Sequence, residues 1–479
     1  MNSEAGVAGG PELHRTLGTS DLVLLNIAAI VGLRWLSVAA QIGTSSLTLW
    51  ALGLITFLVP SALTVLELSS RLPGEGGLYL WSKAAFGDAH GFVAGWSYWV
   101  ANLVFFPSLL LFTAAVLLYV PGGAWVGLAD NPLYNGVVCL GILWFATLLN
   151  IVGLERAKWL QNAGATATWV VGALVLGGGI VAWHRFGTAT PIVAKGFVPD
   201  LRSLATLASF ATIALAYSGL ELGPIMGGEI KNPRRTIARA LLIACVAIAA
   251  LYMSGTAALL AALPASEINA VSGVPQALSA VAARVGAPLL GAVAAALVTL
   301  ASMGGLGAWI AGTARLPFLF GLHRYLPKRL GAVHPKFGSP HVALLTQAVL
   351  TTLVLLAALS GSAIHEAYTV LIDMTVILTF VPLLYMFAAA PVLRLRARGT
   401  HSGVTLIPGG ALGSWLVAAL GFSVTLLAVL FAMVPPAASA SRGLFTLKVV
   451  GGSVLLIAVG LMFYFRGRRC VSAALRAPN

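Results

Sequence analysis

One short segment places a phenol, a hydroxyl, a glycine and a carboxyl inside an otherwise apolar stretch. It reads Tyr-Ser-Gly-Leu-Glu at 217–221 and follows an apolar run that begins at Ser209. A helix that breaks within hydrocarbon leaves N–H and C=O groups without water, so breaks persist only where protein or a cavity covers them. A carboxyl such as Glu221 is rare in a membrane span and is usually functional. The segment predicts an unwound binding site; the alternative is a helix that tolerates one glycine and ends near Glu221.

A second glycine with a charged neighbour lies near the start of the chain. Gly32 precedes Arg34 in an apolar run that begins after Asp21. At 1.5 Å per residue, Arg34 lies about 20 Å along such a helix from Asp21. The two interruptions are five predicted helices apart. This pattern is expected when two five-helix halves form inverted repeats whose broken first helices meet at the membrane midplane.

The elements that must position these breaks are predicted to be membrane-spanning helices. The chain has 479 residues, of which 59% are hydrophobic and 9% charged. Soluble domains contain about 25% charged residues, so a water-soluble fold is excluded. Residues 1–20 lack the apolar core of a signal peptide. Apolar runs long enough to cross the bilayer are expected at 20–42, 46–69, 91–120, 132–152, 160–183, 204–228, 236–261, 287–317, 341–360, 366–390, 411–434 and 444–466.

The basic residues responsible for the net charge of +14 lie mainly in the connections between the spans. If both termini are cytoplasmic, 21 of the 28 basic residues fall in cytoplasmic segments or the span ends beside them, six in outer segments or the span ends beside them, and Arg34 within a span. This bias fixes the orientation by the positive-inside rule and predicts a multi-pass protein of the cell membrane. The basic excess is therefore an orientation signal in contact with lipid rather than a nucleic-acid patch. The three cysteines have no metal or redox spacing.

Further candidate residues lie in three other spans. The third span contains Tyr98 and Asn102, and the tenth contains Asp373. The eighth is rich in small residues, which favours close helix packing, although Thr299 and Ser302 are also candidates for coordinating a cation.

Three interpretations of Arg34 remain open. It binds a substrate carboxylate, it pairs with a protein carboxylate, or it extends to water from the end of a span. Arg34 and Asp373 are expected at a similar depth, where an unpaired charge is costly. If their helices meet, we therefore expect them to pair as part of an outer gate, or Arg34 to alternate between Asp373 and an acidic substrate. The glycine-rich segment 73–77 is expected to be a cytoplasmic loop, with inner gating as the alternative.

These residues resemble the amino acid–polyamine–organocation superfamily of transporters over nearly the whole chain. Residues 217–221 are similar to its aromatic-x-Gly-aliphatic-Glu core, and Gly-Glu-Ile-Lys-Asn-Pro-Arg-Arg at 228–235 to its cytoplasmic corner. Supporting matches are Glu-Leu-Ser at 67–69, Pro-Gly-Glu-Gly-Gly-Leu-Tyr at 73–79, and Ala-Gly-Thr-Ala-Arg at 311–315. Within the superfamily, the chain resembles bacterial amino acid permeases near the glutamate/GABA antiporters.

The resemblance implies an all-α fold of twelve transmembrane helices, with a leucine-transporter-like 5+5 inverted repeat and two extra helices. It implies a cytoplasmic tail (1–19), a first repeat (20–186), an outer loop (187–203), a second repeat (204–391), two further spans (392–466) and a final tail (467–479). An amino acid is expected where spans one and six unwind. Val31, Gly32 and Leu33 would face its carboxylate, and Tyr217, Ser218 and Gly219 would offer carbonyls or an aromatic lid.

The sequence departs from the family pattern at two positions. Arg34 stands where the family's first span usually has a second glycine. In span five, Thr168 stands where some proton-coupled members have a lysine. Proton coupling through an amine is therefore in doubt, and sodium remains an alternative.

The leading hypothesis is a secondary active amino acid transporter, working as an exchanger or a proton symporter. A transporter of polyamines or other organic cations is an alternative, as is an amino acid sensor with the same fold. An enzyme is disfavoured because the spans lack a catalytic motif or a metal-ligand cluster. A channel is disfavoured because no repeated filter loop or charged ring is present. No cofactor is expected. The substrate and oligomeric state stay open.

Overall fold

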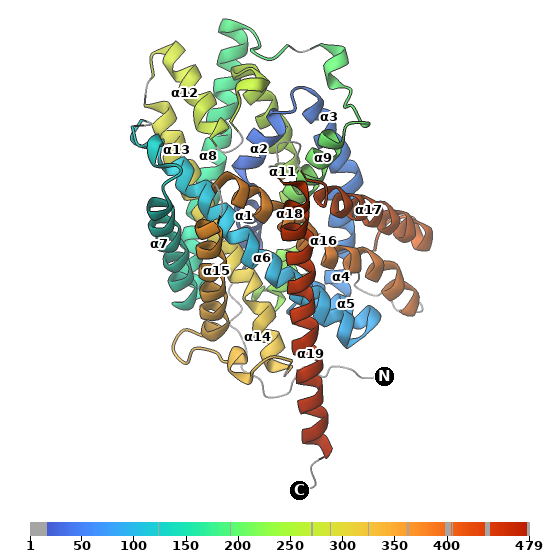
Figure 1. Cartoon of the computed structure of the whole chain (residues 1–479). Coiled ribbons are helices and arrows are strands. Elements are labelled where there is room, and N and C mark those ends of the chain that lie inside the picture. The colour runs from blue at the N-terminus through green and yellow to red at the C-terminus, as the bar shows by residue number, and fades with distance from the viewer. Residues whose placement is uncertain are drawn as a thin grey trace.

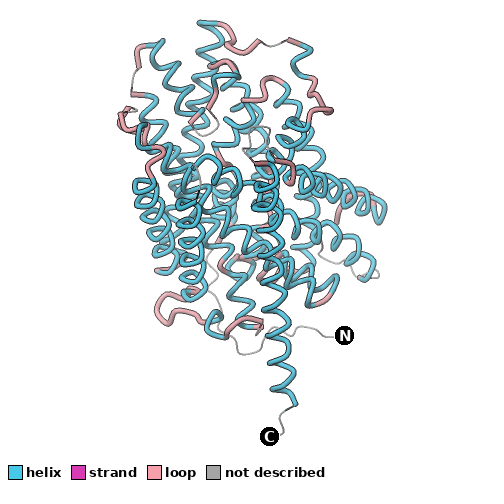
Figure 2. The backbone as a smooth tube through the Cα atoms, viewed as in Figure 1, coloured by secondary structure: helices cyan, strands magenta, loops and turns pink. Residues whose placement is uncertain are grey.

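The computed structural model describes residues 17–476, apart from positions 123, 192, 270, 271, 288, 324, 362, 363, 398–403, 405 and 436–440. Most of the tail expected at 1–19 therefore lies outside the described residues. Helices make up nearly all of the described chain and form one bundle (Figures 1 and 2). The prediction of an all-α membrane protein is confirmed.

The first half of the chain supplies two short helices in its first span and long helices after it. Its elements are α1 (Thr19–Ile30), α2 (Leu33–Ala40), α3 (Ser45–Gly53), α4 (Val59–Arg71), α5 (Leu78–Phe86), α6 (Asp88–Leu117), α7 (Pro132–Ile151) and α8 (Leu154–Phe186). A five-residue π turn joins α3 to α4 within the second span. The helix α6 crosses the middle of the bundle and packs on α5, α13 and α16 (Figure 1).

The second half repeats the pattern of a divided first span followed by longer helices. Its elements are α9 (Leu204–Ala216), α10 (Leu222–Ile225), α11 (Pro233–Ala262), α12 (Gly273–Val285), α13 (Leu290–Thr313), α14 (Arg315–Leu322), α15 (His341–Gly361), α16 (Ile364–Arg396), α17 (Gly410–Ala432), α18 (Arg442–Thr446) and α19 (Gly452–Arg476). The last helix continues past the expected end of its span at 466, as far as Arg476.

Eleven of the expected spans are helices long and apolar enough to cross a membrane, within the described residues. The sixth, expected at 204–228, is not continuous because its helix ends at Ala216, and only a shorter apolar helix represents it. The sequence predicted this interruption. The count of twelve continuous spans is therefore not reproduced, and the reason is the break itself.

Glycines in the eighth span allow close helix contacts, as predicted. A Cβ atom added to Gly164 of α8 would lie 2.6 Å from Cα of Gly304 on α13. A Cβ atom on Gly305 would lie 2.5 Å from the carbonyl oxygen of Ala28 on α1. Small residues are common where membrane helices approach closely, because bulky side chains would separate the backbones. The helix α13 thus reaches the backbone of α1 just before that helix ends.

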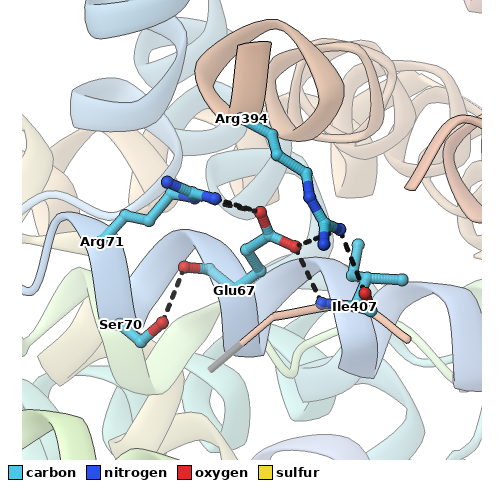
Figure 3. A network of polar contacts seen from close by, with 5 residues as sticks. All are labelled: Glu67, Ser70, Arg71, Arg394 and Ile407. Carbon is cyan, nitrogen blue, oxygen red and sulfur yellow. Dashed lines mark hydrogen bonds and ion pairs between the residues drawn. The ribbon is translucent and has the colours of Figure 1, made fainter. Parts of the chain in front are cut away.

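A buried carboxylate fastens three segments at one end of the bundle (Figure 3). Glu67 of α4 accepts hydrogen bonds from Arg71 Nη2 at 2.7 Å and from the backbone N–H of Ile407 at 2.9 Å. Arg394 of α16 lies 3.3 Å from Glu67 Oε2 and donates to the Ile407 carbonyl. The Glu67 side chain is fully buried. Charge pairing and hydrogen bonds compensate its desolvation, so the contact fixes α4 against α16.

The charge distribution and the fold together predict which end faces the cytoplasm. The short helices η3 (Ala194–Phe197) and η6 (Lys328–Gly331) pack at opposite ends, on α3 and on α14 respectively (Figure 1). We expect a membrane-impermeant maleimide to label Lys195→Cys on intact cells, in a background without the three native cysteines. Lys336→Cys, an equally exposed position, should react only after permeabilisation. The reverse labelling pattern would contradict the orientation.

Candidate functional site

Both predicted interruptions are present and lie at glycines. The helix α1 ends at Ile30 and α2 begins at Leu33, while α9 ends at Ala216 and α10 begins at Leu222. Gly219 has a φ of 121°, a conformation that other residues rarely adopt. At Gly32 an added Cβ would lie 2.7 Å from the Trp35 ring, so glycine lets that ring fold back over the break.

One tyrosine hydroxyl joins the two breaks. Tyr252 of α11 donates to the carbonyl of Ile30 at 2.6 Å and lies 3.2 Å from the carbonyl of Ala216. The same oxygen accepts the N–H of Gly32 at 3.1 Å. The Tyr252 ring stacks on Trp50, with centroids 4.5 Å apart. A single buried hydroxyl therefore satisfies backbone groups of both interrupted spans, which no water could do within hydrocarbon.

A second aromatic donor supports the end of α1. Trp309 of α13 donates its indole N–H to the carbonyl of Ala29 at 2.8 Å. Its ring centroid lies 5.7 Å from that of Phe105 on α6. Backbone acceptors at the end of α1 are thus held by side chains from α11 and α13, so both helices depend on the position of the break.

The Glu221 carboxyl forms hydrogen bonds that hold the second break in place. Its Oε1 accepts the hydroxyl of Tyr98 at 2.8 Å, and its Oε2 accepts the N–H of Gly219 at 3.1 Å. The residue is 1% exposed. The alternative of a helix that tolerates one glycine and ends near Glu221 is wrong, because α9 already ends at Ala216. The two acceptor oxygens of Glu221 hold the unwound segment against α6.

Two small cavities adjoin the breaks, each of about 30 Å³. The first is lined by Asn102, Ser218 and Trp309 among others, and the second by Val31, Gly32, Leu33, Arg34 and Ser302 among others. Both share Ala29, Trp35, Phe105 and Trp309. Such a volume accommodates about one water molecule, so aromatic side chains close the site in this conformation.

Six of the predicted site residues do not line either cavity: Tyr98, Tyr217, Gly219, Glu221, Thr299 and Asp373. Tyr98 is engaged by Glu221, and the Tyr217 hydroxyl donates to the carbonyl of Trp50 at 3.3 Å. The Thr299 hydroxyl donates to Ala295 O of its own helix at 2.8 Å. Gly219 acts through its backbone N–H. Direct contact of the Tyr98 and Tyr217 side chains with a ligand is therefore not a feature of this conformation.

The expected pairing of Arg34 with Asp373 does not occur here. Among the described residues, no ion pair joins them, although Arg34 is 1% exposed. The guanidinium instead lies over two rings, with Cζ 4.2 Å from the Trp35 centroid and 4.9 Å from that of Phe105. Arg34 does not extend to water either, because its side chain is enclosed.

A buried ion pair joins two of the family motifs at the end of the bundle where η6 lies. Arg315 at the start of α14 donates from Nε to Glu229 Oε2 at 3.0 Å and from Nη2 to Oε1 at 2.9 Å. Its third nitrogen, Nη1, donates to the carbonyl of Ala311. The backbone N–H of Leu17, just before α1, donates to the Glu229 carbonyl at 3.0 Å. This pair lines a cleft of about 510 Å³, together with Arg156 and Lys336 among others.

The glycine-rich loop before α5 packs on the same pair. The N–H of Gly76 donates to the carbonyl of Ile225 at 2.9 Å, and a Cβ on Gly228 would lie 2.9 Å from Glu75 Oε2. Part of the Glu75 side chain reaches the surface, but its Oε1 is shielded and meets no hydrogen-bond partner among the described residues. Burial and the Glu229 carboxylate raise the pKa of Glu75 to about 8, and Arg315 offsets part of that rise.

Sequence reasoning did not find Tyr252, Trp35, Phe105 or the role of Glu75. Tyr252 left a detectable signal, because it is a polar aromatic residue in the middle of the long apolar helix α11. The residues Trp35 and Phe105 left none, since aromatic residues are common in membrane spans. Only the folded backbone brings both rings into contact with the guanidinium of Arg34.

Comparisons with known proteins agree with this architecture. The family model described as amino acid permease matches residues 17–455. An uncharacterized transporter of Legionella pneumophila is 29% identical over 94% of this chain and 96% of its own length. A glutamate/gamma-aminobutyrate antiporter of Lactococcus lactis is 26% identical, covering 83% of this chain and 79% of the antiporter. A probable agmatine/putrescine antiporter of the same species is 28% identical over 49% of each chain.

The bridge made by Tyr252 predicts a large effect for Tyr252→Phe. The variant keeps the ring on Trp50 but removes the partner of Gly32 N–H and the donor to Ile30 O. Each buried group left unpaired costs about 1–3 kcal/mol. We expect a lower melting temperature and severely reduced transport. Tyr134→Phe loses one hydrogen bond, to Ala114 O, far from the breaks and is the matched control. Equal behaviour of the two variants would contradict the bridge.

The environment of Glu75 predicts a pH-dependent stability. Because its pKa is raised from 4.5 to about 8, folding favours the protonated carboxyl, and this stabilisation is lost as the pH rises through 8. We expect the melting temperature of the wild type to fall between pH 6 and pH 9 relative to Glu75→Gln, which stays neutral. Glu155→Gln, which removes an exposed carboxyl of α8, should follow the wild type. Parallel curves for the wild type and Glu75→Gln would contradict the prediction.

Proposed function

The chain belongs to the amino acid permease family and is a secondary transporter of amino acids or their derivatives, and we propose that the two helix breaks form its substrate site. The observation that supports this placement is the meeting of both interrupted spans at the Tyr252 hydroxyl. Two helices that served only to support the fold could be continuous, and they would not need two breaks held together beside small cavities. Irregular backbone in a membrane is otherwise avoided.

Backbone dipoles at the breaks suit the two charged ends of an amino acid. The N-terminus of α2, at Leu33 and Arg34, directs N–H groups toward a carboxylate beside Val31 and Gly32. The C-terminal ends of α1 and α9 direct carbonyls toward an ammonium group, with Ser218 and Asn102 on the cavity wall. Entry of a substrate requires Trp35, Phe105 or Trp309 to move, because the cavities hold about one water each.

Transport then follows alternating access between two repeats, spans one to five (20–186) and six to ten (204–391). The paired interruptions in the first span of each half support this division. The ion pair of Glu229 with Arg315, together with the loop that contains Glu75, acts as the inner gate in a cell membrane where both termini are cytoplasmic. Glu221 maintains the unwound segment, and Asp373 belongs to the outer half of the pathway.

Exchange of one substrate for another is the mode that the relatives favour, since two of them are named antiporters. A proton symporter is the second mode, for which Glu75 and Glu221 are the candidate proton carriers. In span five, Thr168 donates its hydroxyl to Gly164 O at 3.0 Å, so no amine occupies that position.

Reconstitution distinguishes a transporter from a sensor with the same fold. Liposomes that contain the purified protein and an unlabelled amino acid should accumulate the same amino acid in labelled form. They should do so much faster than liposomes that contain the protein but only buffer inside. A panel of neutral, acidic and basic amino acids, with putrescine and agmatine, covers the candidate substrates. Binding that raises the melting temperature without any flux, under inward proton or sodium gradients as well, would identify a sensor and overturn transport.

A further inference from the structure

Arg34 is a buried cation without a counter-charge in this conformation. It is 1% exposed, and its terminal nitrogens Nη1 and Nη2 meet no hydrogen-bond acceptor among the described residues. The phenol of Tyr368 approaches from α16 without reaching hydrogen-bond geometry at either nitrogen. The rings of Trp35 and Phe105 contribute cation–π attraction, but a neutral ring does not cancel a charge.

No carboxylate of the described residues pairs with Arg34. Glu221 accepts hydrogen bonds from Tyr98 and from Gly219, and it does not line either central cavity. Asp373 forms no ion pair with Arg34 within the described chain. Arg34 is the one charged residue among those that line the two cavities. The site therefore has a positive charge that the protein itself leaves unbalanced.

A zwitterionic amino acid would not correct this imbalance. Its carboxylate and ammonium groups match the N–H groups of α2 and the carbonyls of α1 and α9, and its net charge is zero. Arg34 would stay uncompensated in a closed, low-dielectric site, where an unpaired charge is expensive. An amino acid with a second carboxylate supplies the missing charge. A diamine would add further positive charge beside the guanidinium and would be repelled.

Building on the proposed function, we propose that Arg34 binds a second carboxylate of the substrate and restricts the site to anionic amino acids. The carboxylate reaches Nη1 and Nη2 beside the Trp35 and Phe105 rings, where a guanidinium offers a bidentate contact. Neutral amino acids leave Arg34 unpaired and bind weakly, and organic dications are excluded. Two relatives are named for opposite substrate charges, glutamate on one side and agmatine or putrescine on the other. Arg34 assigns this chain to the anionic class.

Counterflow in proteoliposomes tests the assignment with paired probes that differ by one charge. Labelled L-glutamate and L-aspartate are compared with L-glutamine, L-asparagine and putrescine, each against the same compound inside. For the wild type we expect exchange of at least one acid to exceed that of its amide about tenfold or more, with no putrescine exchange. In Arg34→Gln the ratio of acid to amide should fall by about tenfold to a hundredfold, the effect of losing a charged hydrogen-bonded pair.

Two further variants separate charge from folding. Arg34→Lys keeps the charge without the bidentate geometry, so it should retain the preference for acids with a higher KM. Arg185→Gln makes the same substitution at an exposed position of α8 and should match the wild type. Melting temperatures of all variants verify folding. If Arg34→Gln does not fold, the wild-type and Arg34→Lys ratios still decide the proposal.

The outcomes distinguish the inference from the function on which it rests. Equal exchange of acids and amides by the wild type, exchange of putrescine, or an unchanged ratio in folded Arg34→Gln would overturn the role of Arg34 while leaving an amino acid transporter. Absence of exchange and gradient-driven flux for every amino acid would overturn the proposed function, and the inference with it.

Discussion

Unpaired backbone groups at two helix breaks are the constraint on which this structure depends. In hydrocarbon, a free N–H or C=O cannot bond to water, so each break needs donors and acceptors from neighbouring helices. Tyr252 supplies them to both breaks at once, and Trp309 supplies another at Ala29. The helices α11 and α13 are therefore tied to the same point. A movement of either break must be accompanied by a rearrangement of these contacts.

Glycines determine how closely the surrounding helices can approach the two breaks. Gly305 brings α13 against the Ala28 carbonyl, and Gly164 meets Gly304 where α8 crosses α13. At the other end of the site, Gly228 leaves room for the Glu75 carboxyl beside the buried pair of Glu229 and Arg315. Close packing thus surrounds both the breaks and the ion pair. Such packing favours discrete alternative arrangements over gradual deformation, as alternating access requires.

The charges of the protein fall into two kinds. Those at the end of the bundle near η6, Glu67 with Arg71 and Arg394, and Glu229 with Arg315, are compensated within the fold. Arg34 in the central site is not. A fold retains an unbalanced buried charge at a cost, which a bound partner of opposite sign can offset. The contrast supports our proposal that substrate charge is recognised at the centre and that access is controlled at the end.

The amino-acid sequence alone predicts the class of the fold and the positions of the helix breaks. Long apolar runs require helices in a bilayer, and a glycine beside a charged residue marks where such a helix breaks, so Gly32, Gly219 and Glu221 were identifiable. The motif residues Glu229 and Arg315 were also identifiable, but not as partners, because 86 positions separate them.

Which groups meet depends on the tertiary structure. In the fold, Glu221 accepts a hydrogen bond from Tyr98, whereas Arg34 does not pair with Asp373. Equal depth in the membrane does not by itself bring two helix faces together. The fold also places Tyr252 between both breaks. Hydrophobic periodicity records which face of a helix is buried, whereas pairing depends on rotation and crossing of helices, which side-chain packing alone sets.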